Sequence, residues 1–191
     1  MSRFSPSNYV GRPIISTNPC AEVPLEDGGA CNLGSINLSR FVKDGYSEQA
    51  TIDWDQLADT TRTLVRFLDN VVTWNEQLNA LEKQRIAAAE TRRLGLGIMG
   101  AADMLNQLAI HYDSEEGIET MGRLMSFIAN AAYQASAGLA EEKGESPIFD
   151  QNYLKCPFIK EALSIETQKI IKEKGIRNIA ILSIAPTGTI S

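Results

Sequence analysis

The stretch Asn178-Ile-Ala-Ile-Leu-Ser-Ile-Ala185 decides the fold class of this sequence. It is short and almost entirely apolar, which is typical of a strand buried on both faces of a parallel sheet. A helical pattern precedes it at residues 165–174, and it ends at Pro186-Thr-Gly-Thr-Ile-Ser191. A helix followed by a doubly buried strand predicts an α/β architecture in which helices alternate with a few buried strands.

Two longer amphipathic helices are predicted upstream of this strand. The first covers residues 53–75, and the second begins near Asp113, where Asp113 and Glu116 form a capping-box pattern, and stops at Lys143-Gly144. At 1.5 Å per residue the second helix would be about 43 Å long, which suggests a scaffold larger than this chain. The apolar positions of the two helices recur at spacings of three and four: Leu57, Ala58, Leu64, Val65, Leu68, Val71 and Val72, then Ile118, Met121, Met125, Ile128, Ala132, Ala135 and Leu139.

The rest of the chain divides by composition into three parts of one predicted domain, residues 1–191. Residues 1–35 hold four prolines and the pair Gly28-Gly29, so they are predicted to be extended chain and loop. Residues 36–177 are predicted to be mostly helical. They are interrupted by a short apolar run, residues 92–100, that is expected to be a strand or turn leading into a short helix at residues 101–108. Residues 178–191 form the buried strand and the loop after it.

Composition excludes several classes of protein. The chain has 191 residues with 18 Lys and Arg against 24 Asp and Glu, a net charge of −6, which rules out a strong basic field for nucleic acid. With 43% hydrophobic residues the chain is expected to form a packed core. No apolar stretch is long enough for a membrane span and no secretory signal is present, so a soluble, cytoplasmic protein is expected. The three cysteines fit a reducing compartment.

The run Gly95-Leu-Gly97-Ile-Met-Gly100 matches the dinucleotide-binding pattern G-x-G-x-x-G. That pattern requires a strand before it and an acidic residue at a later strand end, whereas the preceding residues 84–93 are helical in composition. Two interpretations remain, a nucleotide site or glycines that allow close approach of the backbone. The first would make the chain a dinucleotide-binding oxidoreductase.

The segment Asn18-Pro-Cys20-Ala-Glu22 is the first candidate for chemistry. Pro19 disfavours helical geometry for Asn18 and keeps the local chain extended. Because side chains alternate in extended chain, an amide, a thiol and a carboxylate are expected on one face. They could orient a hydroxylated substrate, carry out sulfur chemistry and move a proton. The alternative is a polar loop with an incidental cysteine.

Cys31 follows Cys20 by eleven residues, after a glycine turn that could bring the two sulfurs together as a dithiol. The only histidine, His111, stands just before a predicted helix, so a cysteine nucleophile with a histidine base is not expected. The loop at residues 186–191 follows a buried strand with glycine and hydroxyl groups, which predicts an anion cradle or an ordinary strand-ending turn. No set of metal ligands is predicted.

Four motifs in this order resemble the large catalytic chain of ribonucleotide reductases, above all the adenosylcobalamin-dependent class II type. They are Asn18-Pro-Cys20-Ala-Glu22, Ala30-Cys31-Asn-Leu-Gly-Ser-Ile-Asn-Leu38, Arg92-Arg93-Leu-Gly-Leu-Gly-Ile-Met-Gly100 and Ala185-Pro-Thr-Gly-Thr-Ile-Ser191. The resemblance covers nearly all of the chain from about residue 10 and corresponds to a middle-to-late section of such a reductase. Some class I large chains carry similar motifs.

The resemblance implies a role for each matching residue. Cys20 would become a thiyl radical and remove the 3′ hydrogen of the ribose, Glu22 would accept the 3′-hydroxyl proton, and Asn18 would hydrogen-bond the ribose hydroxyls. Cys31 would be one member of the pair that is oxidised to a disulfide. The substrate phosphates would lie on Pro186, Thr187, Gly188, Thr189, Ile190 and Ser191. Cys156 lies outside the motifs and is expected to be structural.

The resemblance also implies what the chain needs from outside. The fold would be a helix-rich section of a ten-stranded α/β barrel, incomplete on its own, in a ribonucleoside di- or triphosphate reductase that makes deoxyribonucleotides for DNA synthesis. Adenosylcobalamin would bind mainly outside this chain. Partners would be complementary reductase chains, the ribonucleotide and a thioredoxin-type reductant acting through cysteines that this chain lacks. A split reductase active only after assembly is therefore expected, and the alternative is a non-catalytic assembly module.

Overall fold

Two parallel strands form the centre of the fold in the computed structural model, which describes residues 2–190. β3 (Asn32–Asn37) pairs with β6 (Leu94–Met99) in a register that runs from Asn32 opposite Leu94 to Asn37 opposite Met99. β3 was not predicted as a strand, because its residues lack a run of β-branched or aromatic side chains. β6 was expected as a strand or turn, and Gly100 in the left-handed conformation turns the chain from it into α3 (Ala101–Gln107).

The stretch at residues 178–185 runs alongside β6 as a third, irregular segment. Its backbone is bonded to β6 through Leu94 N to Ala180 O (2.9 Å), Leu96 N to Ile181 O (2.8 Å) and Ser183 N to Leu96 O (2.9 Å). The segment and β6 are paired as strands at one isolated parallel bridge, between Leu96 and Leu182. The prediction of a regular strand is therefore wrong. Burial alternates along the segment, with Ile181 and Ser183 buried and Ile184 exposed, so it is not covered on both faces.

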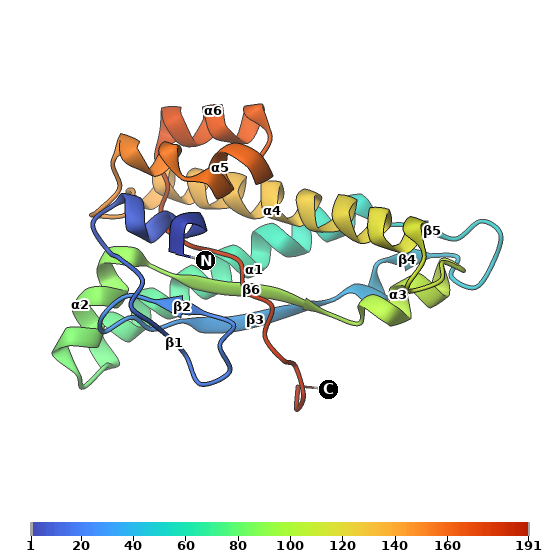
Figure 1. Cartoon of the computed structure of the whole chain (residues 1–191), viewed down its shortest axis with the longest axis horizontal. Coiled ribbons are helices and arrows are strands. Elements are labelled where there is room, and N and C mark those ends of the chain that lie inside the picture. Colours follow the sequence, from blue (N-terminus) through green and yellow to red (C-terminus); the bar gives the residue numbers. More distant parts are fainter. Residues whose placement is uncertain (1, 191) are drawn as a thin grey trace.

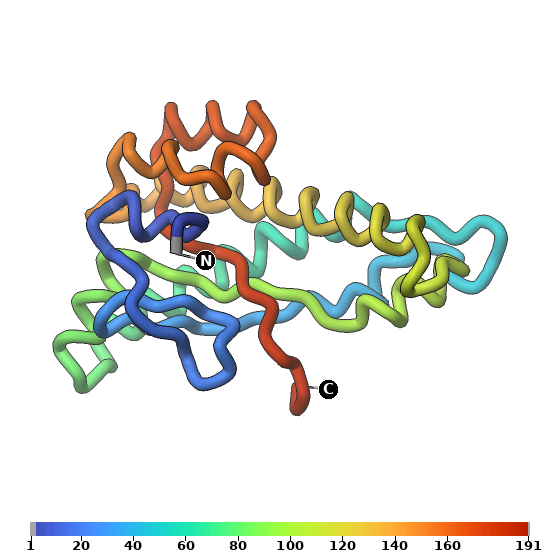
Figure 2. The backbone as a smooth tube through the Cα atoms, viewed as in Figure 1, coloured from blue at the N-terminus to red at the C-terminus, as the bar shows by residue number. Residues whose placement is uncertain are grey.

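Helices cover one side of this strand group, stacked one upon another (Figure 1). α1 (Trp54–Leu78) packs against β3 and β6, α4 (Glu115–Lys143) packs against α1, and α6 (Ile165–Lys174) packs against α4. The shorter helices are α2 (Glu82–Thr91) and α5 (Pro157–Ala162). The C-terminal segment crosses β6 and its final turn projects away from the helices, as Figure 2 shows.

The predicted helices are confirmed, with two corrections at the second. Asp53 caps α1 by accepting a hydrogen bond from Gln56 N, and Gly144 ends α4. Ser114, not Asp113, caps α4, because its hydroxyl accepts the hydrogen bond from Gly117 N. Ile118 was expected in the buried stripe but is 68% exposed, because the buried face of α4 begins with Gly117, Thr120 and Leu124 and Ile118 lies beside it.

The N-terminal third is less regular, as expected for a segment rich in proline. It contains the 3-10 helices Ser2–Phe4 and Pro6–Tyr9 and an antiparallel hairpin of β1 (Ser16–Thr17) and β2 (Pro24–Leu25). A second small hairpin pairs β4 (Val42–Lys43) with β5 (Thr51–Ile52). Two further 3-10 helices cover Leu38–Arg40 and Gln151–Lys155. The strands of the described residues form three two-stranded sheets and do not close into a barrel.

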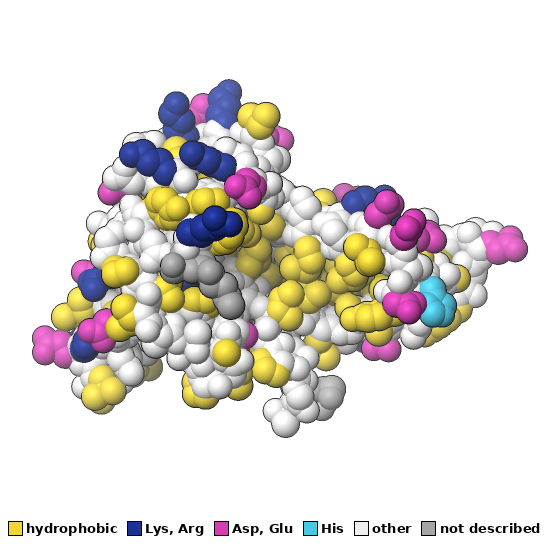
Figure 3. All heavy atoms as spheres, in the orientation of Figure 1, with side chains coloured by type: hydrophobic (Ala, Val, Ile, Leu, Met, Phe, Trp, Pro, Cys, Tyr) yellow, Lys and Arg dark blue, Asp and Glu magenta, His cyan; other side chains and the backbone are white. Residues whose placement is uncertain are grey.

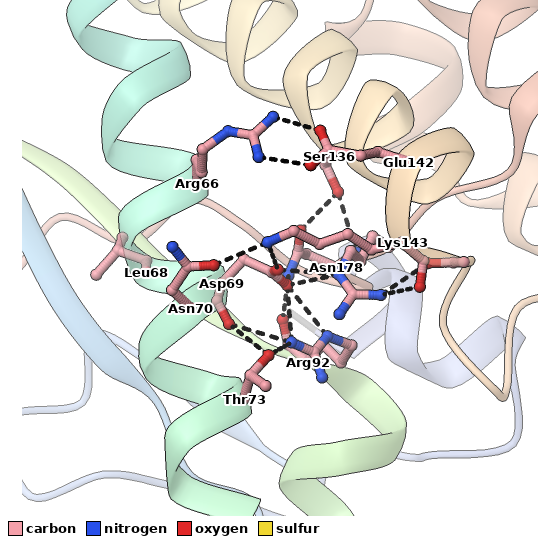
Figure 4. A network of polar contacts seen from close by, with 12 residues as sticks. Arg66, Leu68, Asp69, Asn70, Thr73, Arg92, Ser136, Glu142, Lys143 and Asn178 are labelled. Atoms are coloured by element: carbon pink, nitrogen blue, oxygen red, sulfur yellow. Dashed lines mark hydrogen bonds and ion pairs between the residues drawn. The ribbon is translucent and has the colours of Figure 1, made fainter.

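A buried polar network around Asp69 joins α1, α2, α4 and the C-terminal segment (Figure 4). The Asp69 side chain is fully buried and accepts hydrogen bonds from Arg92, Arg177 and Asn178, with Arg177 Nε at 2.9 and 3.0 Å from its two oxygens. Lys143 Nζ lies 3.4 Å from the same carboxylate. Burial acts to raise the pKa of Asp69, but the hydrogen bond from Arg177 and the charge of Arg92 outweigh it, and the pKa is lowered.

The glycines of the dinucleotide-like motif lie inside β6 and allow close packing. A Cβ atom on Gly97 would collide with the backbone carbonyl of Ser183, and one on Gly95 would lie 2.8 Å from the Cys31 sulfur. Both positions are therefore occupied by neighbouring protein atoms, not by open space for a pyrophosphate. The structure supports the close-approach interpretation of this motif.

The surface carries both signs of charge, with Lys and Arg gathered over α5 and α6 in the view of Figure 3. Within residues 2–190, no helix is long and apolar enough to cross a membrane.

Candidate functional site

The loop between β1 and β2 presents Cys20 at its tip. Asn18 closes the loop: its Oδ1 accepts a hydrogen bond from Val23 N at 3.0 Å, and its backbone N donates to Val23 O at 3.2 Å. Ala21 adopts a left-handed conformation with φ of 63° and donates its N–H to Asn18 O at 3.0 Å. The expectation of extended chain from residue 18 to 22 is therefore wrong, because the loop turns back on itself within these residues.

The turn nevertheless places two of the three predicted side chains on one cleft. Cys20 and Glu22 line a cleft of about 400 Å³ together with residues 185–190 and with Leu33, Gly34 and Ser35 of β3. Asn18 does not line this cleft, since its amide oxygen is used inside the loop. The sulfur, the carboxylate and the Thr-Gly-Thr turn thus share one cavity although they come from opposite ends of the sequence.

Ser183 connects the two ends of the chain at this cleft. Its hydroxyl donates a hydrogen bond to the backbone carbonyl of Glu22 at 3.0 Å, and its own backbone N–H is bonded to Leu96 O in β6. The loop that carries Cys20 is therefore anchored to the same segment that leads into the turn at 186–190. The sequence analysis treated Ser183 only as part of an apolar stretch; a polar residue at a buried strand position was the signal.

Glu22 has an unpaired oxygen at the cleft. Its Oε2 atom is buried and has no hydrogen-bond partner among residues 2–190, while the residue as a whole is half-buried. A buried acceptor without a partner is costly unless a ligand or water supplies a donor. This carboxylate is therefore suited to accept a proton or a hydroxyl hydrogen bond from a molecule in the cleft.

The turn at residues 186–190 has free backbone donors. The N–H groups of residues 187–189 make no hydrogen bond within the described part of the chain, and Thr187 has a left-handed φ of 54°. Gly188 has no atom within 4 Å of the position that a Cβ would take, so space is open beside it. Free N–H groups around open space suit an anionic group such as a phosphate. Ser191, the last residue predicted for this cradle, lies outside the described residues.

Cys31 lies in a different cavity from Cys20. It lines a space of about 150 Å³ with Arg93, Asn75 and apolar residues of α1 and α2. Burial raises the pKa of the Cys31 thiol to about 12; the charge of Arg93 lowers it, and the carboxylates of Glu22 and Glu26 raise it further. The two sulfurs therefore do not share a cleft, but Glu22 lines the cleft of Cys20 and its charge acts on Cys31.

The remaining cysteine and the histidine are separate from the cleft. Cys156 is fully buried, and its sulfur donates a hydrogen bond to Phe4 O at 3.4 Å, which is a structural contact as expected. His111 is exposed and lies 2.7 Å from Asp113 Oδ1. Neither residue lines the cleft that holds Cys20.

A parallel pair of strands covered by helices places the chain in the α/β class. The family model described as "Ribonucleotide reductase, barrel domain" matches residues 3–191. The chain belongs to the ribonucleotide reductase family, and it forms a partial section of the barrel of that family.

Named relatives and a solved structure support this assignment. The chain is 40% identical over its full length to a vitamin B12-dependent ribonucleoside-diphosphate reductase of Mycobacterium tuberculosis (strain CDC 1551 / Oshkosh), of which it covers 24%. It is 41% identical over its full length to the protein of the same name from Thermoplasma acidophilum, of which it covers 22%. The class Id ribonucleotide reductase alpha subunit of Actinobacillus ureae shares the fold, with a TM-score of 0.67 and 22% identity over 96% of this chain and 31% of that one. The chain therefore spans about a quarter of the length of these two reductases.

Proposed function

We propose that this chain is the section of a ribonucleotide reductase that carries the radical cysteine and the phosphate turn. The observation behind the proposal is that Cys20, Glu22 and residues 185–190 line one cleft of about 400 Å³. The reaction would reduce a ribonucleotide to a 2′-deoxyribonucleotide. The two similar reductases are named for ribonucleoside diphosphates, so a diphosphate is the proposed substrate.

Cys20 is proposed to remove the 3′ hydrogen atom of the ribose as a thiyl radical. Hydrogen-atom transfer uses a neutral sulfur, so the step needs no base to form a thiolate, in contrast to a nucleophilic cysteine. The exposed position of Cys20 at the loop tip leaves its sulfur free to meet a substrate. Contact distance between the sulfur and the C–H bond is the main requirement of this step.

Glu22 is proposed to take the 3′-hydroxyl proton while the 2′ oxygen leaves. Its unpaired Oε2 atom supports this role, because an acceptor that is already desolvated gains most from a substrate hydroxyl. Asn18 is proposed to hydrogen-bond the ribose hydroxyls. Because its side-chain oxygen already accepts a hydrogen bond from Val23 N, Asn18 would have to donate from its amide N–H₂ group to the ribose.

The substrate phosphates are proposed to bind the turn at residues 186–191. The free N–H groups of residues 187–189 and the hydroxyls of Thr187 and Thr189 provide neutral donors. Cys31 is proposed to belong to the cysteine pair that becomes a disulfide as the sugar is reduced. Its partner would come from another part of the assembled enzyme.

Adenosylcobalamin is the proposed cofactor, since the two similar reductases are named as vitamin B12-dependent. The residues present fit the cofactor at one point: Cys20 is exposed and lies on the cleft, so its sulfur can exchange a hydrogen atom with a group that approaches from outside the chain. When bound, the cofactor would supply the one-electron chemistry that starts the reaction. The proposed partners are complementary reductase chains or segments and a thioredoxin-type dithiol reductant.

The proposal is tested by mixing the chain with upstream and downstream reductase segments, adenosylcobalamin, a dithiol and a ribonucleoside diphosphate, and measuring deoxynucleotide formation. Turnover is expected, and Cys20→Ser should abolish it because an O–H bond is too strong to be exchanged in place of S–H. Cys156→Ala is the matched control, since Cys156 lies away from the cleft. No turnover in any combination, or full activity of Cys20→Ser, would contradict the proposal and favour a non-catalytic assembly module.

A further inference from the structure

Arg93 and Glu26 form a buried ion pair next to Cys31. Arg93 Nη2 lies 2.5 Å from Glu26 Oε2 and 2.6 Å from Ser7 Oγ, and the two charged side chains are 4% and 1% exposed. Arg93 also lines the 150 Å³ cavity that holds the Cys31 sulfur. A charged pair is rarely buried this deeply unless its environment holds it in place.

The strand register explains why these groups meet. Asn32 is opposite Leu94 in the parallel pair of β3 and β6, so one residue earlier Cys31 is next to Arg93. Residues opposite one another in a parallel pair point to the same face of the sheet. Gly95 keeps the space for the sulfur, because a Cβ there would lie 2.8 Å from Cys31 Sγ.

Two polar atoms of the ion pair have no hydrogen-bond partner. They are Arg93 Nε and Glu26 Oε1, which are buried and unpaired among residues 2–190. The other side chains of the cavity are not titratable: Ala30, Asn32, Val71, Val72, Asn75 and Ala88. Glu22, on the β1–β2 loop, is the only further charged group whose field acts on the thiol. Arg93 is therefore the one cation that acts on Cys31 in this part of the structure.

We propose that Arg93 is a positioning residue that stabilises the thiolate of Cys31, and that Glu26 holds Arg93 in place and limits this effect. The inference rests on the proposed function, in which Cys31 enters a disulfide and must leave it again. In that exchange a dithiol reductant attacks the disulfide, the S–S bond breaks, and its electron pair stays on the leaving sulfur. When Cys31 is the leaving sulfur, a guanidinium beside it favours its departure.

The test is the rate at which iodoacetamide alkylates each cysteine of the whole chain between pH 7 and 10, measured by mass spectrometry of the digested peptides. Arg93→Met is expected to slow alkylation of Cys31 about tenfold at each pH, which corresponds to one pKa unit. Arg93→Lys keeps the positive charge and should restore most of the rate. Glu26→Gln should change the rate in the opposite direction and speed it. Exposed Cys20 in the same digest is the reference.

Hydrogen exchange of the peptide that contains Cys31 separates electrostatics from loosening of the structure. Unchanged exchange with opposite changes in alkylation for Arg93→Met and Glu26→Gln supports the proposal. If both variants alkylate faster in proportion to faster exchange, or if neither changes, the proposal is wrong. If Arg93→Met fails to fold, the alkylation rates and hydrogen exchange of Arg93→Lys and Glu26→Gln are compared in the same way and decide the proposal. The measurement needs no turnover, so its result is independent of whether the chain supports reductase activity.

Discussion

The substitution Gly97→Ala tests whether the glycine motif of β6 exists for packing. A Cβ at this position would collide with the carbonyl group of Ser183, and its neighbour Ile184 Cα would lie at 3.4 Å. Both contacts are with backbone atoms, so no side chain can rotate away. The C-terminal segment would have to move away from β6.

The expected loss in the free energy of unfolding follows from the backbone hydrogen bonds that such a movement would stretch. Leu96 N to Ile181 O and Ser183 N to Leu96 O, at 2.8 and 2.9 Å, connect the segment to β6 on either side of the collision. Loss of one of these two backbone hydrogen bonds costs about 1 kcal/mol net, and overpacking costs roughly 1–3 kcal/mol. Gly97→Ala should therefore lower the free energy of unfolding by about 2–4 kcal/mol.

Urea unfolding followed by far-UV circular dichroism measures this loss. With a slope of about 2 kcal/mol/M, the midpoint should fall by about 1–2 M. Gly122→Ala is the matched control: Gly122 is exposed in the middle of α4 and has nothing within 4 Å of a new Cβ. Because alanine is the better helix former by about 1 kcal/mol, this variant should be slightly more stable than the parent. A Gly97→Ala variant as stable as the parent would refute the packing argument.

Three further predictions concern charges and thiols. Asp69→Asn should lower the free energy of unfolding by about 3–5 kcal/mol in urea, because it removes the buried carboxylate that pairs with two arginines. Since the pKa of Asp69 is lowered on folding, its contribution should be present above about pH 4 and lost as the pH falls through the lowered pKa, which acid titrations of unfolding will show. Arg66→Ala should cost less than about 1 kcal/mol in the same assay, since its pair with Glu142 is half exposed. Ellman's reagent should label Cys20 in the native chain and Cys156 only after unfolding; prompt labelling of both would contradict the burial of the second.

The helices could be predicted from the sequence because their signals are local. The apolar period and the caps of α1 and α4 are contained in the helices themselves, so their limits were expected to within a few residues. β3 was missed because its stability comes from β6, which is distant in the sequence, and its own residues have little strand preference. Residues 178–185 have strand composition, but only part of the segment is within bonding distance of β6.

For the candidate site too, the sequence indicated residue types but not the contacts between residues that are far apart in the chain. The residue types at Cys20, Glu22 and the 186–190 turn marked them as candidates, and the structure places these residues on one cleft. Their arrangement was predicted for the wrong reason, because Ala21 adopts a left-handed conformation that nothing in the sequence indicates. Ser183 and Arg93 could not be assigned, since their roles depend on partners far away in the chain.

Glu22 connects the two sulfur sites. Its backbone carbonyl is held by Ser183, its side chain lines the cleft of Cys20, and its charge raises the pKa of Cys31. The cleft reaches β3 at Leu33, two residues after Cys31, which is only about 7 Å along a strand. In the proposed reaction Glu22 would take a proton from a sugar bound beside Cys20. One negative charge that acts on Cys31 would then disappear, and ionisation of the Cys31 thiol would become easier.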